Sequence, residues 1–191
     1  MSLWIEVSSP RTRRLEPKPS PCYARPMPIL TATLLVTLAT TAAPSTDPPC
    51  YASETAIVIL TSTHDLFLCE NGRAIDRYTV ALGSGGTGKR REGDDRTPLG
   101  SYPLSLGRPS KEFGTFLPVG YPTPAQRRQG FTGGAIGIHG PKRGARWLGR
   151  MGTVVDWTRG CVAVASDAQI KAVTSWVGRT KAAVVRIERG R

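Results

Sequence analysis

The sequence predicts a mainly β fold, with its strands in a closed or sandwiched sheet and one helix near the C-terminus. Glycine (21 residues) and proline (16 residues) are abundant, which favours an architecture rich in turns. From residue 55 onward, short runs of apolar and β-branched residues are separated by turn signals, a pattern typical of strands. Because a helix pattern comes only late in the chain, we do not expect a parallel β–α–β layout.

The first 43 residues are predicted to be a leader rather than part of the fold. Residues 29–43, ILTATLLVTLATTAA, form an uncharged apolar run that ends in small residues. This length suits a signal sequence and is short for a membrane span. We therefore expect export, with an uncleaved membrane anchor as the alternative. Residues 44–54 are predicted to be a proline-rich linker, and residues 55–191 the folded domain.

The expected strands follow the linker in order. Asn71-Gly72 is a hairpin-turn signal, and His64, between the first two strands, is interpreted as a turn residue. A polar, glycine-rich connection is expected over residues 83–100. The expected strands are residues 55–62, 65–70, 74–82, 101–106, 116–121, 135–139, 161–165 and 182–188.

The one expected helix runs from about residue 167 to residue 177. Ser166 precedes it as N-cap, and Gln169 follows three residues later, which is the spacing of a capping box. Gly178 is expected to end the helix.

The net charge of +12 indicates an anionic neighbour, such as nucleic acid, an anionic membrane face or an acidic cell-wall polymer. The arginines are scattered, without the basic helix or interleaved aromatic residues of nucleic-acid-binding modules, so we expect no nucleic-acid partner. Residues 83–89, GSGGTGK, match the first seven positions of a phosphate-binding loop. Arg90 stands where Ser or Thr would hold magnesium, and no helix can follow, so nucleotide binding is a distant alternative.

If the protein is exported as the leader predicts, its cysteines lie in an oxidising compartment. Cys22 falls in the predicted leader. In an oxidising compartment Cys50 and Cys69 are candidates for a disulfide, although their spacing does not decide whether they pair. Cys161 would then stay free. The chain has no HExxH or CxxC pair and few histidines, so we expect no metal and no cofactor.

One histidine and one cysteine, each beside a glycine, are the candidate catalytic residues. His139 is followed by Gly140, and Cys161 is preceded by Gly160. A thiol needs a nearby base to become a nucleophile at neutral pH, and imidazole is the usual one. Backbone N–H groups around Gly160 and Cys161 are candidates for an oxyanion hole. Taken separately, each side chain is more often a buried thiol or a structural histidine.

Residues 93–102, GDDRTPLGSY, are a third motif that indicates which family of cysteine enzymes the candidate residues belong to. Together with the His-Gly and Thr-Arg-Gly-Cys frames they resemble the L,D-transpeptidase catalytic domain, also called the YkuD domain. Members of that family carry a Gly-Asp-x-x-Thr-Pro-x-Gly-x-Tyr segment, then a histidine, then a Ser/Thr-x-Gly-Cys frame. The resemblance covers roughly residues 55–188.

The resemblance implies a YkuD-like β-sandwich or barrel and a cysteine acyltransferase that acts on peptidoglycan stem peptides. It implies that Cys161 is the nucleophile and that His139 is its base, oriented by the carbonyl of Gly140. The cysteine would release D-alanine and hold the acyl group as a thioester, for transfer to an amine. With water as acceptor, the enzyme would be an L,D-carboxypeptidase or endopeptidase. A non-catalytic wall-binding module is the remaining alternative.

The residues beside the cysteine are expected to contact substrate, namely Trp157, Thr158 and Arg159. Many members have histidine at the position of Arg159. The guanidinium of Arg159 cannot act as a base, but it can orient a substrate carboxylate or lower the pKa of a thiol. Ala163 stands where many members have Asn or Arg, which leaves the choice of acceptor open. We expect a monomer, located in the periplasm or at the cell wall.

Overall fold

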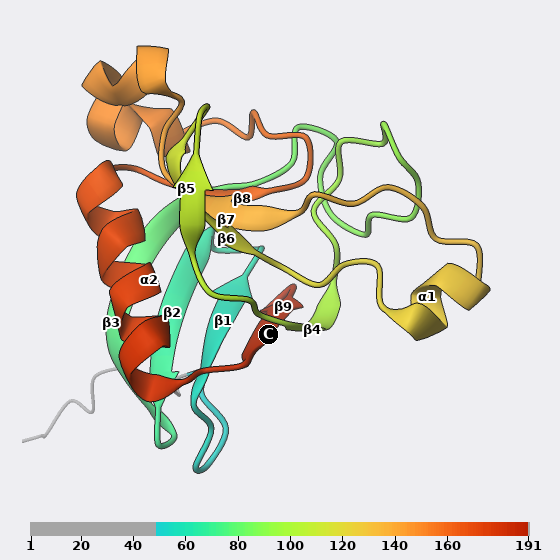
Figure 1. Cartoon of the computed structure of the whole chain (residues 1–191), viewed down its shortest axis with the longest axis horizontal. Helices are drawn as coiled ribbons and strands as arrows, with labels where there is room; N and C mark the ends of the chain where they lie inside the picture. The colour runs from blue at the N-terminus through green and yellow to red at the C-terminus, as the bar shows by residue number, and fades with distance from the viewer. Residues whose placement is uncertain (1–48, 191) are drawn as a thin grey trace, which may run out of the picture. The chain divides into compact units, whose positions relative to one another are not determined.

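The computed structural model describes residues 49–190, so the predicted leader, Cys22 and the first residues of the linker lie outside the described residues. Within this part, nine strands form one sheet in the order β4-β9-β1-β2-β3-β8-β7-β6-β5 (Figure 1). The strands are β1 (Ala56–Leu60), β2 (Asp65–Glu70), β3 (Arg73–Ala81), β4 (Gly100–Pro103), β5 (Arg108–Ser110), β6 (Gly114–Pro118), β7 (Gly137–His139), β8 (Val162–Val164) and β9 (Val184–Glu188).

The sheet is mixed and curls back on itself. Only β1 with β9 and β7 with β8 pair in parallel. An isolated bridge between Leu104 and Val119 connects the residues that follow β4 and β6, and Gly120 N–H donates to the Pro103 carbonyl at 2.8 Å. These contacts draw distant strands of the order together, which confirms the expected mainly β, curled architecture.

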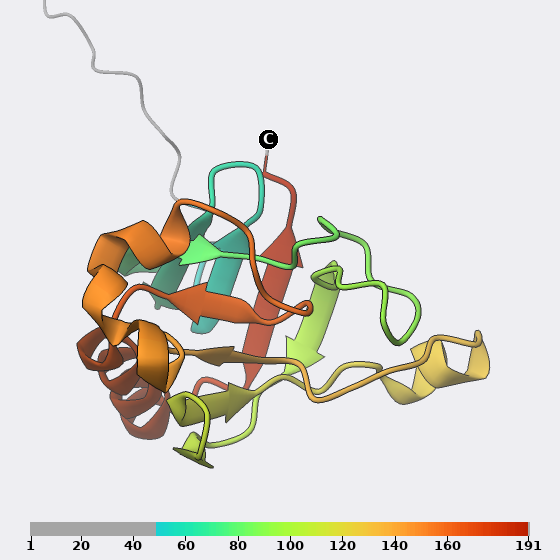
Figure 2. The same cartoon turned by 90° about the horizontal axis from the view of Figure 1, so that it is seen from above.

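The hydrophobic core lies between this curled sheet and helix α2 (Asp167–Thr180). Both views show α2 along one side of the sheet (Figures 1 and 2). Its buried face consists of Ile170, Val173, Trp176 and Val177. Residues 56–59 of β1 are also buried, as is typical of a strand covered on both faces. Burial of each large apolar side chain contributes about 1.5–3 kcal/mol.

Helix α2 begins where the sequence predicts and ends later. Ser166 Oγ accepts from Gln169 N–H at 3.2 Å. The expected capping box is wrong, because Gln169 Oε1 accepts from the N–H of Ala165 rather than from that of Ser166. The expected end at Gly178 is also wrong. The helix continues to Thr180, and Lys181 ends it with a left-handed backbone (φ 57°).

The turn between β2 and β3 is as predicted, and a disulfide links β2 to the segment that precedes β1. Asn71 and Gly72 both have positive φ, at 52° and 79°, which the tight turn between β2 and β3 requires. Cys50 and Cys69 are paired, with their Cα atoms 5.6 Å apart. The disulfide ties the start of the described chain to β2 and stabilises the fold by about 2–4 kcal/mol.

Several strand ends differ from the expected ones. The strand expected over 101–106 ends at Pro103, which pairs with Val184, the first residue of β9. Leu104 N–H still donates to the Ala183 carbonyl at 2.8 Å, and Leu104 also bridges Val119. The strand expected over 135–139 begins only at Gly137, since Ala135 has a left-handed backbone (φ 52°).

Three elements were not predicted: β5, α1 (Pro124–Arg128) and η1 (Arg143–Thr153), a 3₁₀ segment kinked at Gly149. The helical content therefore exceeds the single helix expected. Among the described residues, no helix is both long and apolar enough to cross a membrane.

Candidate active site

The sheet brings His139 and the segment that carries Cys161 together. His139 is the last residue of β7, and it pairs with Ala163 in the parallel strand β8. Cys161 lies two residues before Ala163, so the alternation of a strand places its side chain on the same face as that of His139. Both residues line a cleft of about 860 Å³. The structure therefore unites the two candidates that lay far apart in the sequence.

His139 is buried, at 1% exposure, and held in one orientation. Its Nδ1 lies 2.7 Å from the carbonyl oxygen of Gly140. A carbonyl can only accept, so Nδ1 carries the proton and Nε2 is left with a free lone pair. Phe113 stacks on the imidazole, with the ring centres 3.7 Å apart and the planes 19° apart. These contacts present Nε2 as the basic atom.

The surroundings keep the imidazole neutral at ordinary pH. Burial lowers the pKa of His139 to about 4, and it outweighs the opposing effects of the Gly140 hydrogen bond and of Glu112. A neutral imidazole is the form that accepts a proton from a thiol.

Cys161 is half-buried and unoxidised. Its Sγ lies 3.5 Å from the carbonyl oxygen of Ala135. Burial raises the pKa of the Cys161 thiol, while a hydrogen bond from the Gly137 backbone to the sulfur opposes this rise. The site therefore holds a neutral thiol and a neutral imidazole in the same cleft.

Thr158 fastens the turn that carries the cysteine. Its hydroxyl donates to the Cys161 carbonyl at 2.7 Å and accepts from Gly160 N–H at 3.1 Å. Its own N–H donates to the Leu82 carbonyl at 3.1 Å. Thr158 is 3% exposed and its hydroxyl is engaged within the turn, so the side chain positions Cys161. Thr158 also lines the cleft, and its contact with a substrate stays a prediction.

Position 160 accepts only glycine without strain. Its φ of 108° is one that side chains rarely adopt, and a Cβ there would lie 2.4 Å from the Arg96 carbonyl oxygen. Its N–H is already engaged by Thr158, so it is not the free oxyanion donor that the sequence suggested. Of the two N–H groups considered, that of Cys161 is the remaining candidate.

Asp156 and His64 form an anchor that the sequence did not reveal. His64 is the predicted turn residue, with a φ of 55°, but its Nε2 also lies 3.1 Å from Asp156 Oδ2. The other carboxylate oxygen of Asp156 accepts from Leu82 N–H at 2.7 Å. Leu82 thus bonds through its N–H to Asp156 and through its carbonyl to Thr158. The segment 156–161, which we call the cysteine loop, is therefore hydrogen-bonded to both the N–H and the carbonyl of Leu82, the residue that follows β3.

The stretch 93–102 lies beside the cleft, and Gly93 and Asp95 line it. Thr97 is fully buried, and its Oγ1 accepts from Gly83 N–H at 2.8 Å. Asp94 accepts from Lys89 Nζ at 2.7 Å and from the N–H groups of Arg90 and Arg91. These donors outweigh burial and hold the pKa of Asp94 well below its usual range.

The buried ion pair with Asp94 removes the phosphate-binding alternative. Lys89 is 5% exposed and donates to Asp94 and to the Arg91 carbonyl. Its ammonium is therefore committed within the loop, and no helix follows the glycine-rich stretch.

The remaining predicted residues occupy the rim of the cleft. Arg159 is exposed there. Trp157 lies edge-on to His139, with the ring centres 5.8 Å apart, and Lys142 Nζ lies 5.7 Å from its ring centre. Ala163 is buried at 1% exposure in β8. Phe113, Glu112 and Lys142 also line the cleft, and no sequence signal singled them out, because only the fold brings them there.

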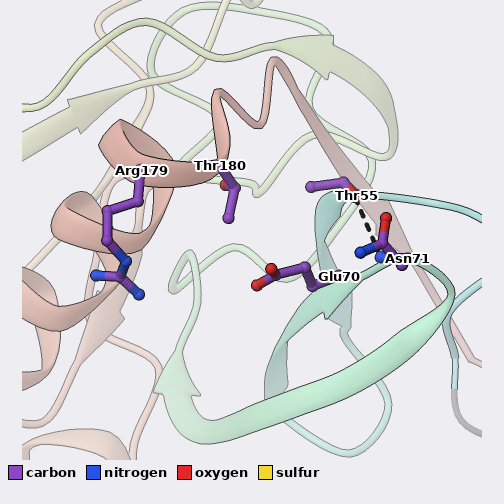
Figure 3. Close-up of a pocket in the computed structure, with 5 residues that line it drawn as sticks. All are labelled: Thr55, Glu70, Asn71, Arg179 and Thr180. Carbon is purple, nitrogen blue, oxygen red and sulfur yellow. Dashed lines mark hydrogen bonds between the residues drawn. The ribbon is translucent and has the colours of Figure 1, made fainter.

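A second hollow, of about 320 Å³, lies at the far end of α2 (Figure 3). It is lined by Thr55, Glu70, Asn71, Arg179 and Thr180. It contains no thiol or imidazole, and Glu70 already accepts from Trp176 Nε1. We therefore place the candidate site at the larger cleft. No group of three or more metal-binding side chains occurs within residues 49–190.

The chain is similar to a known family and to solved structures. A family model described as the L,D-transpeptidase catalytic domain (YkuD) matches residues 54–187. The fold is similar to that of the helical cell shape determining protein Pgp2 from Campylobacter jejuni, at 25% identity and a TM-score of 0.58, covering 74% of this chain and 50% of Pgp2. It is also similar to Bd1075 from Bdellovibrio bacteriovorus, at 21% identity and a TM-score of 0.52, covering 73% of this chain and 49% of Bd1075. The chain spans about half the length of these structures. No curated protein sequence matches it.

Proposed function

Since the chain belongs to the YkuD family of L,D-transpeptidase catalytic domains, we propose that it is a peptidoglycan L,D-transpeptidase with Cys161 as its nucleophile. The observation that carries the proposal is the pairing of β7 with β8, which sets His139 and Cys161 in one cleft. We further propose that residues 1–43 export the protein to the periplasm or cell wall, where residues 55–191 act on stem peptides.

In the proposed acylation, the thiol proton passes to His139 Nε2 as Cys161 Sγ attacks a peptide carbonyl. The carbonyl belongs to the L-centre residue that precedes a terminal D-alanine. A C–S bond forms, the C–N bond breaks, and His139 returns the proton to the amine of the leaving D-alanine. The Gly140 carbonyl, 2.7 Å from Nδ1, stabilises the imidazolium that exists between these steps.

In the proposed deacylation, an amine attacks the thioester carbonyl and loses a proton to His139. The C–S bond breaks, the proton returns to the sulfur, and the acyl group leaves on its new amine. The N–H of Cys161 is the proposed oxyanion donor in both halves. Arg159, exposed at the rim, is proposed to bind a substrate carboxylate, and Trp157 to contact the stem peptide.

Water is the alternative acceptor, and it would make the protein an L,D-carboxypeptidase. The observation that keeps this alternative is Ala163, which is buried and supplies no polar atom for an acceptor amine. The likeness to Pgp2, a cell shape determining protein, supports a role in cell shape for either reaction. A non-catalytic wall-binding module is the third alternative.

The test is to incubate the full chain with purified sacculi and to analyse the muropeptides by mass spectrometry. Cross-linked products that have lost D-alanine support the transpeptidase, whereas shortened monomers alone support the carboxypeptidase. The matched control is Cys161→Ser, which keeps size and shape but replaces the thiol. If the wild type and this variant give identical muropeptides, the enzymatic proposal is wrong.

A further inference from the structure

Segment 141–155, which includes η1, has an apolar surface without a partner in the described domain. Four large apolar side chains there are between 66% and 82% exposed. They are Trp147, Met151, Val154 and Val155. We call them the η1 patch. Soluble surfaces carry single exposed apolar residues without consequence, whereas several within nine residues mark an interaction site.

The charge of the same segment is of one sign. Residues 141–155 contain Lys142, Arg143, Arg146 and Arg150 and no acidic residue. Arg146 is paired with Asp167 at 3.0 Å, and Lys142 lies 3.5 Å from Glu112. Arg143 and Arg150 are exposed, with no ion pair among residues 49–190. The segment thus offers apolar side chains together with unpaired cations.

The fold holds this segment in place. Arg143 N–H donates to the Glu112 carbonyl at 3.0 Å, and Trp157 Nε1 donates to the Gly152 carbonyl at 2.9 Å. Thr153 is buried and its hydroxyl donates to the Arg150 carbonyl. Figures 1 and 2 show η1, drawn in orange, at the margin of the domain beside the start of α2. The η1 patch is therefore presented outward on an anchored element, and little ordering is needed before it binds.

We propose that the η1 patch docks on an anionic phospholipid surface. Tryptophan and other apolar side chains enter the boundary between headgroups and acyl chains, while arginines beside them bind lipid phosphates. A water-soluble polyanion would match the arginines but would leave the apolar side chains exposed. A neutral protein partner would match the apolar side chains but not the charge. Lipid satisfies both, and the net charge of the whole chain, +12, attracts the protein to such a surface.

This docking would direct the catalytic cleft toward the membrane face of the wall. Lys142, near the start of the segment, and Trp157, two residues after its end, line the cleft. The inference itself stands on the η1 patch and does not depend on the proposed reaction.

The test measures hydrogen exchange of the full chain with vesicles of phosphatidylglycerol and phosphatidylcholine, and with phosphatidylcholine alone. Peptides from residues 141–155 give a local readout, which membrane binding by residues 1–43 cannot imitate. We expect exchange there to slow with the anionic vesicles only. Slowing that appears with increasing protein concentration alone would assign the η1 patch to a second copy, and slowing with sacculi but not with vesicles would assign it to the wall. Either result overturns the proposal.

Two double variants, each with a control, test separately the apolar side chains and the arginines of segment 141–155. Trp147→Ser with Met151→Ser removes apolar contact, and Arg143→Ser with Arg150→Ser removes charge. Each is expected to weaken the vesicle-dependent protection by at least about tenfold in apparent Kd. Leu106→Ser, at a residue 68% exposed outside the η1 patch, and Arg179→Ser, an exposed arginine elsewhere, are expected to behave as wild type. If the variants bind as the controls do, the proposal is wrong.

Discussion

His139 shows how one carbonyl and burial set the tautomer and the protonation state of an imidazole. The Gly140 carbonyl holds the proton on Nδ1, and burial lowers the pKa of the imidazole to about 4. Cys161 is held in the thiol form by burial. The site therefore does not store a thiolate, and its reactivity depends on proton transfer during attack.

The first prediction concerns the pH dependence of acylation by a carbapenem, whose strained carbonyl reports a reactive thiol. His139 must be neutral to act, so the rate constant should fall on the acid side with a midpoint near pH 4 rather than near 6.5. Stopped-flow measurement over this range tests it. A midpoint near 6.5 would mean that the imidazole is not shielded from water in the way described.

The second prediction concerns Gly160→Ala. The new Cβ would lie 2.4 Å from the Arg96 carbonyl at a φ of 108°, so we expect a loss of about 1–3 kcal/mol in unfolding free energy and slower acylation of Cys161. Gly86→Ala is the matched control, since Gly86 also has positive φ but has no atom within 4 Å of the added Cβ. Urea denaturation and the acylation rate compare them. Equal effects of the two changes would contradict the steric argument.

At the scale of the element, the cysteine loop is positioned by bonds to β3 rather than by packing alone. Asp156 and Thr158 hold the two backbone atoms of Leu82, and His64 pairs with Asp156 from the preceding turn. The position of Cys161 thus depends on three segments that are distant in sequence.

The third prediction is that Thr158→Val loses about 1–3 kcal/mol of unfolding free energy, because two backbone groups of the turn lose their partner in a buried site. Thr158→Ser keeps the hydroxyl and is expected to stay near wild type in stability and in acylation rate. Thermal unfolding and intact-mass kinetics measure both. If Val and Ser behave alike, the hydroxyl does not hold the turn.

At the scale of the whole molecule, burial of a neutral imidazole makes stability depend on pH. The folded pKa of His139 is about 4 and the ordinary value is 6.5, so the unfolded chain binds more protons between these values. Stability due to this group is therefore complete above pH 6.5 and is lost as the pH falls through about 4.

The fourth prediction follows from this loss of stability as the pH falls. Between pH 6.5 and pH 4 the wild type should lose about 3 kcal/mol of unfolding free energy through His139. His139→Gln, which does not titrate, should lack this part of the pH dependence. Denaturation curves across the range measure the difference, and parallel pH profiles for the two proteins would refute it.

Much of the local structure could be predicted from the sequence. The strand over residues 65–70, the Asn71-Gly72 turn and the start of α2 follow from patterns within a few residues. Helix α1 also had a local signal that was overlooked, since Thr123 precedes a proline and forms a capping box with Gln126.

The rest depends on contacts between distant segments. The bridge between Leu104 and Val119, the pairing of His64 with Asp156 and the stacking of Phe113 on His139 join residues that no short-range pattern connects. The two catalytic candidates themselves were found only because each lies in a recognisable glycine frame. The engaged N–H of Gly160 could not be foreseen, because it depends on the folded turn.

The central claim is that Cys161 is a nucleophile activated by His139, and intact-mass spectrometry after exposure to a carbapenem tests it most directly. We expect one covalent adduct on the wild type, mapped to Cys161, none on Cys161→Ala, and greatly slowed formation on His139→Gln. A folded wild-type protein that acquires no adduct, or an adduct that persists in Cys161→Ala, would contradict the account.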